Sequence, residues 1–117
     1  MIGIDIIEIK RIEKMIKKFG NRALERFLTP RERIIVSSPS SVAGYWAAKE
    51  AFSKAIGTGI GKECSFLDIE ILKNAKNKPY FSSTTLKKFN LKDADLSISH
   101  DGGFAIAAVI VLKKNMV

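Results

Sequence analysis

The fold is decided by the stretch WAAKEAFSKAIGTGIG (residues 46–61), near the middle of this chain of 117 residues. Its first part has the spacing of an amphipathic helix, in which Glu50 and Lys54 lie one turn apart on the same face. Trp46 precedes Glu50 by one turn, and a glycine-rich loop, Gly57–Gly61, follows. An acid, a base and flexible glycines at one helix end suit the binding of phosphate and metal, but the same pattern is typical of a surface ion pair.

The chain begins with a predicted strand at residues 1–7. Apolar and other side chains alternate there, which directs Asp5 away from the row formed by Ile2, Ile4 and Ile6. Asp5 is therefore interpreted either as a residue of a solvated strand face or as one acid of a metal site.

Short helices and one long helix are predicted between this strand and the glycine loop. Apolar residues recur at helical spacing in residues 8–19, and a shorter helix or turn is expected at 21–27. Thr29 and Glu32 have the spacing of a capping box, so a helix begins there. The long helix is expected to run from the serine-rich break at 37–41 to the glycine loop.

The second half of the chain is predicted to consist mostly of strands. They are expected at residues 65–72, 79–82, 94–99 and 104–112, with a brief helix at 84–89. The turn chemistry of His100–Gly103 predicts that the last two strands form a hairpin. The order indicates an α+β fold in one domain, 1–117, with a mostly antiparallel sheet packed with one long and several short helices.

The composition narrows the classes of partner. A formal net charge of +8 favours anionic partners such as nucleic acid, phosphorylated small molecules, a membrane surface or an acidic protein. No apolar run reaches the roughly 20 residues that span a bilayer, and the first residues do not resemble a secretory signal. Cys64 is the one cysteine, so no internal disulfide can form and a cytoplasmic location is expected.

Asp5 and Glu50 are the candidate magnesium ligands, because magnesium prefers carboxylate oxygens and takes its remaining ligands from water and phosphate. Spacing alone does not show that they meet. Glu8 is a third candidate, although an acid at a helix start also complements the helix dipole. Lys54 is interpreted as a partner of Glu50 or as a group that neutralises phosphate. The glycine loop allows backbone N–H groups to approach an anion, but a helix followed by glycines is not a P-loop.

The segment Ser97–His100 carries the one histidine of the chain. Ser97, Ser99 and His100 offer several hydrogen bonds to a phosphate, whereas a lone histidine in a turn is typically structural. No acid is placed behind His100 except the adjacent Asp101, so no Ser-His-Asp triad is inferred. Cys64 and His100 do not make a zinc pattern.

The basic helix at residues 8–19 is either an ordinary solvated face or a docking surface for an acidic helical protein. Met15 and Phe27 are interpreted as apolar contacts among its charges. No helix-turn-helix, zinc-finger, KH or RNP pattern supports nucleic acid as the partner.

Three segments together resemble the holo-[acyl-carrier-protein] synthase family of 4′-phosphopantetheinyl transferases. They are GIDIIEIKRI at Gly3–Ile12, the stretch at residues 46–61 and SISH at Ser97–His100. The resemblance covers essentially the whole chain, and the KEAFSKA core followed by GTGIG is its most specific part. It implies transfer of the phosphopantetheine arm of coenzyme A to a serine of apo acyl carrier protein, with release of adenosine 3′,5′-bisphosphate, in fatty acid biosynthesis.

The resemblance also implies roles for individual residues. Asp5 and Glu50 match the magnesium ligands, and Lys54 matches the lysine that contacts phosphate. Ser99 and His100 match contacts to the nucleotide end of coenzyme A from a neighbouring subunit of a homotrimer. The cofactor-binding set is Lys54, Gly57, Gly59, Ser99 and His100, and the carrier-docking set is Arg11, Lys14, Met15, Arg22, Arg26 and Phe27. Glu50, Lys54 and Asp5 form the catalytic set, with Glu50 as the first candidate for the base.

The sequence departs from the family pattern at Asn77, where glycine is usual before Lys-Pro, but asparagine tolerates the left-handed backbone that such a turn requires. Two other functions stay open. A small basic binding module would need the lysines and arginines but not Asp5 or Glu50. A magnesium-dependent hydrolase of coenzyme A or nucleotides would use the same acids with water as the acceptor.

Overall fold

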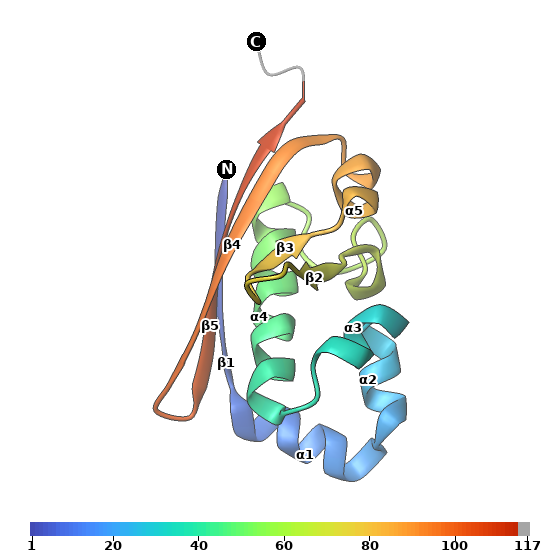
Figure 1. Cartoon of the computed structure of the whole chain (residues 1–117), viewed down its shortest axis with the longest axis vertical. Coiled ribbons are helices and arrows are strands. Elements are labelled where there is room, and N and C mark those ends of the chain that lie inside the picture. Colours follow the sequence, from blue (N-terminus) through green and yellow to red (C-terminus); the bar gives the residue numbers. More distant parts are fainter. Residues whose placement is uncertain (115–117) are drawn as a thin grey trace.

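The computed structural model describes residues 1–114 and shows an α+β fold built around one long helix (Figure 1). The helix α4 (Pro39–Ile56) lies along a three-stranded antiparallel sheet with the order β1-β5-β4. The strands of this sheet are β1 (Ile2–Glu8), β4 (Leu91–Asp101) and β5 (Phe104–Lys113). The predicted fold class is therefore confirmed.

The remaining elements are short and lie along other sides of α4 (Figure 1). A two-stranded sheet pairs β2 with β3, and a 3-10 helix at Phe66–Asp68 precedes it. The elements are α1 (Ile9–Phe19), α2 (Asn21–Phe27), α3 (Pro30–Ile35), β2 (Ile71–Lys73), β3 (Pro79–Phe81) and α5 (Ser83–Lys88). Thr29 and Glu32 form the expected capping box at the start of α3. No helix within residues 1–114 is long and apolar enough to cross a membrane.

The predicted hairpin is confirmed between β4 and β5. Asp101 pairs with Phe104 at its end, and Gly102 and Gly103 form the two-residue loop with φ of 57° and 85°. Two-residue hairpin loops favour positive φ because their twist then matches that of the strands, and glycine adopts it without a steric cost.

The expected strand at residues 65–72 is wrong. Residues Phe66–Asp68 form a 3-10 helix instead, and β2 begins only at Ile71. Ser65 and Asp68 cap this turn reciprocally, and the Ser65 N–H donates to Asp68 Oδ2 at 3.0 Å. Because serine and aspartate side chains bond to the nearby backbone, they draw it away from a strand here. Leu67 is half-exposed while Ile71 is buried, so the apolar residues do not share one face.

The sequence predicted that this helix is amphipathic, but α4 is buried on most of its sides. Its buried residues are Val42, Ala43, Gly44, Tyr45, Ala47, Ala48, Lys49, Ala51, Phe52, Ser53 and Ala55. A helix that is covered on most sides is typical of the centre of a core. Its small residues allow the sheet to approach closely.

The strand β1 alternates as predicted, but its isoleucine row faces away from α4. Ile2, Ile4 and Ile6 are exposed, whereas Ile7 on the opposite face is buried in the core. Asp5 shares the face of Ile7 by alternation and therefore points toward the helix. The apolar row thus covers the outer face of the sheet and leaves Asp5 on the inner one.

Candidate functional site

A close contact between β1 and α4 brings the two predicted acids to one place. An ideal Cβ at Gly3 would lie 1.9 Å from the Ala51 carbonyl oxygen and 2.8 Å from the Ala55 nitrogen. Only glycine permits this approach, since any side chain would meet the helix backbone. Asp5, two residues along the strand, consequently reaches the last turns of α4.

Lys54 bonds to Asp5, not to its helix neighbour Glu50. Its Nζ donates to Asp5 Oδ1 at 2.9 Å and to the Ile4 carbonyl oxygen at 3.1 Å. The Asp5 side chain is largely covered, with 17% exposed, while that of Lys54 is half-exposed. The strand and the helix are therefore joined by an ion pair at a site that solvent can reach.

Glu50 lies close enough to Asp5 for their charges to interact. Burial raises the pKa of the Glu50 carboxyl, and the negative charge of Asp5 raises it further. Lys54 and Arg11 oppose this shift with their positive charges. The structure thus brings Asp5, Glu50 and Lys54 together and adds Arg11, which the sequence assigned to docking alone.

The donor set of this site fits a hard divalent cation. Two neighbouring carboxylates destabilise one another, and a cation between them relieves that repulsion. Magnesium commonly uses one or two protein carboxylates and takes its other ligands from water and phosphate. No group of three or more acid, histidine or cysteine side chains gathers for a metal within residues 1–114, so Glu8 does not complete a larger set.

The glycine loop ends the helix and uses its N–H groups to do so. Gly57 adopts a left-handed conformation at the C-cap. The N–H groups of Gly57 and Gly59 both donate to the Ser53 carbonyl oxygen, at 3.0 and 3.2 Å. Both of these N–H groups therefore have an acceptor within the helix end, and the assignment of Gly57 and Gly59 to coenzyme A binding stays a prediction.

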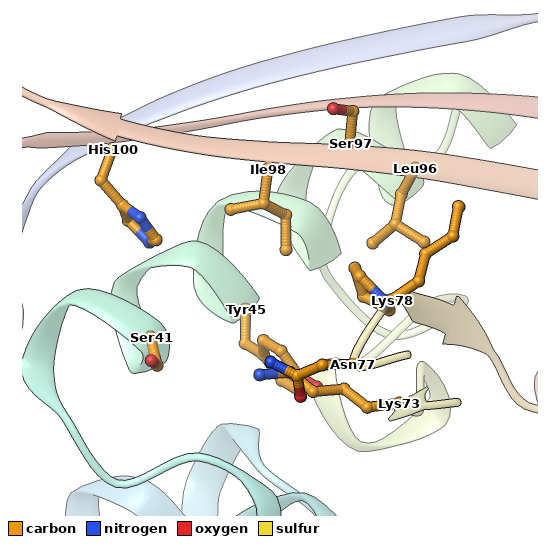
Figure 2. Close-up of a pocket in the computed structure, with 10 residues that line it drawn as sticks. Ser41, Tyr45, Lys73, Asn77, Lys78, Leu96, Ser97, Ile98 and His100 are labelled. Carbon is orange, nitrogen blue, oxygen red and sulfur yellow. The ribbon is translucent and has the colours of Figure 1, made fainter. Parts of the chain in front are cut away.

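His100 lines a cavity of about 330 Å³ between β4, α4 and the turn before β3 (Figure 2). Lys73, Asn77, Lys78 and Ser41 lie around the same cavity. The sequence did not associate these residues with His100, because Ser41 and the stretch 73–78 are both distant from it in the chain and nothing in their spacing links them. The φ of Asn77 is 65°, which agrees with the expected left-handed turn.

Of the two serines of the SISH segment, Ser97 is among the residues that line this cavity with His100, and Ser99 is not. Successive side chains of a strand point to opposite faces, so Ser97 and Ser99 lie opposite to Ile98 and His100. Figure 2 shows Ser97 directed away from Ile98 and His100. Ser99 pairs with Ile106, whose side chain belongs to the exposed apolar face. The predicted Ser/Ser/His grouping is therefore divided between two faces of the sheet.

A second cavity, of about 360 Å³, contains three of the predicted docking residues. Met15, Arg22 and Arg26 line it together with Lys18 and Phe19. Arg11 and Lys14, also in the docking set, are exposed on α1. A basic surface with apolar contacts is thus formed by α1 and α2.

Phe27 does not belong to that surface. Only 1% of it is exposed, and its ring packs edge-on against Trp46 at a centroid distance of 5.0 Å. Phe66 completes this aromatic cluster. The interpretation of Phe27 as a docking contact is corrected, because a large apolar side chain is more stable in the core than among surface charges.

The comparisons with known proteins agree along nearly the whole chain. The family model described as the 4′-phosphopantetheinyl transferase superfamily matches residues 1–109. The chain is 68% identical over 113 residues to the holo-[acyl-carrier-protein] synthase of Nautilia profundicola. This match covers 97% of this chain and 100% of that relative.

Solved structures show the same likeness in three dimensions. The structure of Helicobacter pylori holo-[acyl-carrier-protein] synthase in complex with coenzyme A is 53% identical, with a TM-score of 0.89, and the match covers 95% of this chain and 99% of that chain. A holo-(acyl-carrier-protein) synthase from Bacillus anthracis in complex with CoA (3′,5′-ADP) is 47% identical, with a TM-score of 0.81, and the match covers 97% and 96% of the two chains.

Proposed function

The chain belongs to the 4′-phosphopantetheinyl transferase superfamily, and we propose that it acts as a holo-[acyl-carrier-protein] synthase. It transfers the 4′-phosphopantetheine arm of coenzyme A to a serine of apo acyl carrier protein and releases adenosine 3′,5′-bisphosphate. The main support for this proposal is that Asp5, Glu50 and Lys54 lie together where β1 packs against α4.

The products define which bonds change. The serine oxygen forms a bond to the phosphorus that carries pantetheine, and the bridging oxygen of the pyrophosphate leaves with the adenosine part. Such a transfer depends on positioning and on neutralising charge more than on a covalent group of the enzyme. Asp5 and Glu50 would hold Mg²⁺, which when bound would neutralise and orient the pyrophosphate.

The side chains of this site then have separate roles. Glu50 is the first candidate to accept the proton of the serine hydroxyl. Lys54 contacts the leaving phosphate and supplies the proton that its bridging oxygen takes up. The pair with Asp5 keeps the Lys54 ammonium directed toward the site before substrate binds.

The cavity beside His100 is proposed to bind the nucleotide end of coenzyme A. His100, Lys73 and Lys78 are the groups there that can donate to or neutralise phosphate. Ser99 on the opposite face is proposed to contribute at the subunit boundary. The cavity and the Asp5 site come from different parts of the fold, which favours their meeting across an interface between subunits.

The exposed apolar face of the sheet supports a homotrimer. Ile2, Ile4, Ile6, Ile106 and Ile110 are between 38% and 71% exposed on β1 and β5. A contiguous apolar face of this kind is typical of a surface that another protein covers. We propose that copies of this chain cover it, so that each active site combines residues of two subunits.

The basic surface of α1 and α2 is proposed to dock the acidic carrier. Arg22 and Arg26 supply charge and Met15 an apolar contact beside the second cavity. Arg11 connects this surface to the transfer site, because it lies near Glu50. Opposite charges on enzyme and carrier speed their encounter. We propose that the protein acts in the cytoplasm, in fatty acid biosynthesis, and that it has no nucleic-acid or membrane partner.

Mass spectrometry of an apo acyl carrier protein tests the function. After incubation with this protein, coenzyme A and magnesium, we expect the carrier to gain the mass of one phosphopantetheine. EDTA should abolish the gain, and Arg26→Glu should slow it by weakening docking. Cleavage of coenzyme A without carrier modification would favour the hydrolase, and binding of the carrier without either reaction would favour the binding module.

Mixed oligomers test the shared site. Glu50→Gln and His100→Ala proteins should each have little activity. When equal amounts are refolded together, about a quarter of the wild-type sites should be restored. In a cyclic trimer about half of the subunits then carry an intact Glu50, and about half of their neighbours carry an intact His100. Light scattering should give the mass of three chains. Ile4→Asp, which places a charge on the apolar face, should give monomers and prevent the restoration. No restoration with intact trimers would mean that each subunit holds its own site.

A further inference from the structure

The core contains one ion pair that the reaction chemistry does not use. Lys49 and Glu32 are both 0% exposed, and their side chains meet at 2.6 Å between Nζ and Oε1. Lys49 directly precedes Glu50 in α4, while Glu32 lies in α3. Apart from the capping role of Glu32, no local pattern in the sequence predicted this contact.

The hydrogen bonds around this pair satisfy an ammonium and a carboxylate completely. Lys49 Nζ has three acceptors within hydrogen-bond distance: Glu32 Oε1, the Phe27 carbonyl oxygen at 2.6 Å and the Phe66 carbonyl oxygen at 3.0 Å. A lysine ammonium has three N–H groups, one for each of these acceptors. Glu32 in turn accepts from the N–H groups of Thr29 and Ile71, each at 2.8 Å. Every N–H of the lysine and both oxygens of the glutamate therefore have partners.

Such a pair contributes little to stability by comparison with apolar residues of similar volume, because both charges lose their hydration. Burial lowers the pKa of Lys49 and raises that of Glu32, which reflects the same cost. Its directional bonds, however, fix geometry more narrowly than apolar contacts do. A role in positioning explains this arrangement better than a role in stability.

The bonds of Lys49 join the docking surface to the transfer site. Phe27, whose carbonyl accepts from Lys49, is the last residue of α2, the helix that carries Arg22 and Arg26. Glu50, the next residue after Lys49, interacts with Asp5 on the other side of α4. The ion pair therefore holds the end of the docking helix to the helix that carries the catalytic carboxylate.

We infer that Lys49 and Glu32 are positioning residues for the transfer reaction. Their pair fixes α2 and α3 against α4, so that a carrier docked on α1 and α2 presents its serine at Glu50. Neither residue touches the substrates. The inference rests on the proposed function, and it concerns how fast bound substrates react, not how tightly coenzyme A binds.

The test compares the double variant Glu32→Gln/Lys49→Met with the wild-type protein. It removes both charges and keeps the side-chain volumes similar. We expect kcat for carrier modification to fall about 100-fold, because displacements of about 1 Å cost this much. The KM for coenzyme A should stay within about twofold, since neither Lys49 nor Glu32 lines the cavity beside His100. Val111→Ala, a core change in β5 away from this pair, is the control for general loosening and should leave kcat unchanged.

Each outcome decides the inference. If the folded double variant keeps its kcat, or if Val111→Ala lowers kcat equally, the pair does not position the site. Should the double variant not fold, Glu32→Gln alone keeps the shape and one oxygen acceptor, and the same split between kcat and KM is expected of it. Failure of both to fold would make the pair a stability element and overturn the inference. Absence of transfer by the wild-type protein would instead count against the proposed function.

Discussion

Replacing Glu50 by glutamine should lower the rate of carrier modification about 1,000-fold, which is the upper range for the loss of one electrostatic group from an active site. The amide has almost the same shape but neither accepts the serine proton nor attracts a cation as a carboxylate does. The decrease should be measured by mass spectrometry at saturating coenzyme A, so that it reports on kcat.

The same substitution should not destabilise the protein near neutral pH. The folded state raises the pKa of Glu50, so the stability linked to this group is present at low pH and is lost as the pH rises through the raised pKa. Glutamine does not ionise and avoids that loss. We expect the melting temperature of Glu50→Gln at pH 7 to equal or exceed that of the wild type. Glu63→Gln, an exposed acid in the loop after α4, is the matched control for rate. Equal rates for both variants would exclude Glu50 from the reaction.

Replacing Gly3 by alanine should have the largest effect on stability. The added Cβ would lie 1.9 Å from the Ala51 carbonyl oxygen, so β1 and α4 must separate. Overpacking of a core typically costs about 1–3 kcal/mol of unfolding free energy, and here the obstacle is helix backbone, which yields less than a side chain. Chemical denaturation should show this decrease in unfolding free energy.

Carrier modification should also fall in folded Gly3→Ala, because Asp5 moves with β1 away from Lys54. Gly61→Ala is the matched control for stability, since nothing lies within 4 Å of its ideal Cβ and its φ is not in the left-handed region. If Gly3→Ala is as stable and as active as the wild type, the close contact of β1 with α4 does not position Asp5.

Local signals in the sequence account for the elements that were predicted correctly. The capping box at Thr29, the apolar periodicity of residues 8–19 and the glycine pair at 102–103 each involve residues within a few positions of one another. The segment at 65–72 was misread because its alternating apolar residues resemble a strand, whereas the Ser65–Asp68 cap outweighs that alternation. The resemblance to the transferase family was likewise visible in short motifs, and the comparisons confirm it.

The sequence by itself determined most of the elements, the family and the pair of acids with a nearby lysine, because these depend on residue identity and on short spacings. Only the tertiary structure decided that Lys54 bonds to Asp5, that Phe27 is buried, and that the isoleucine row of β1 faces outward. It alone joined Lys49 to Glu32. These outcomes depend on which elements pack together, and that is set by the summed burial of many side chains far apart in the chain, to which no single stretch of sequence gives access.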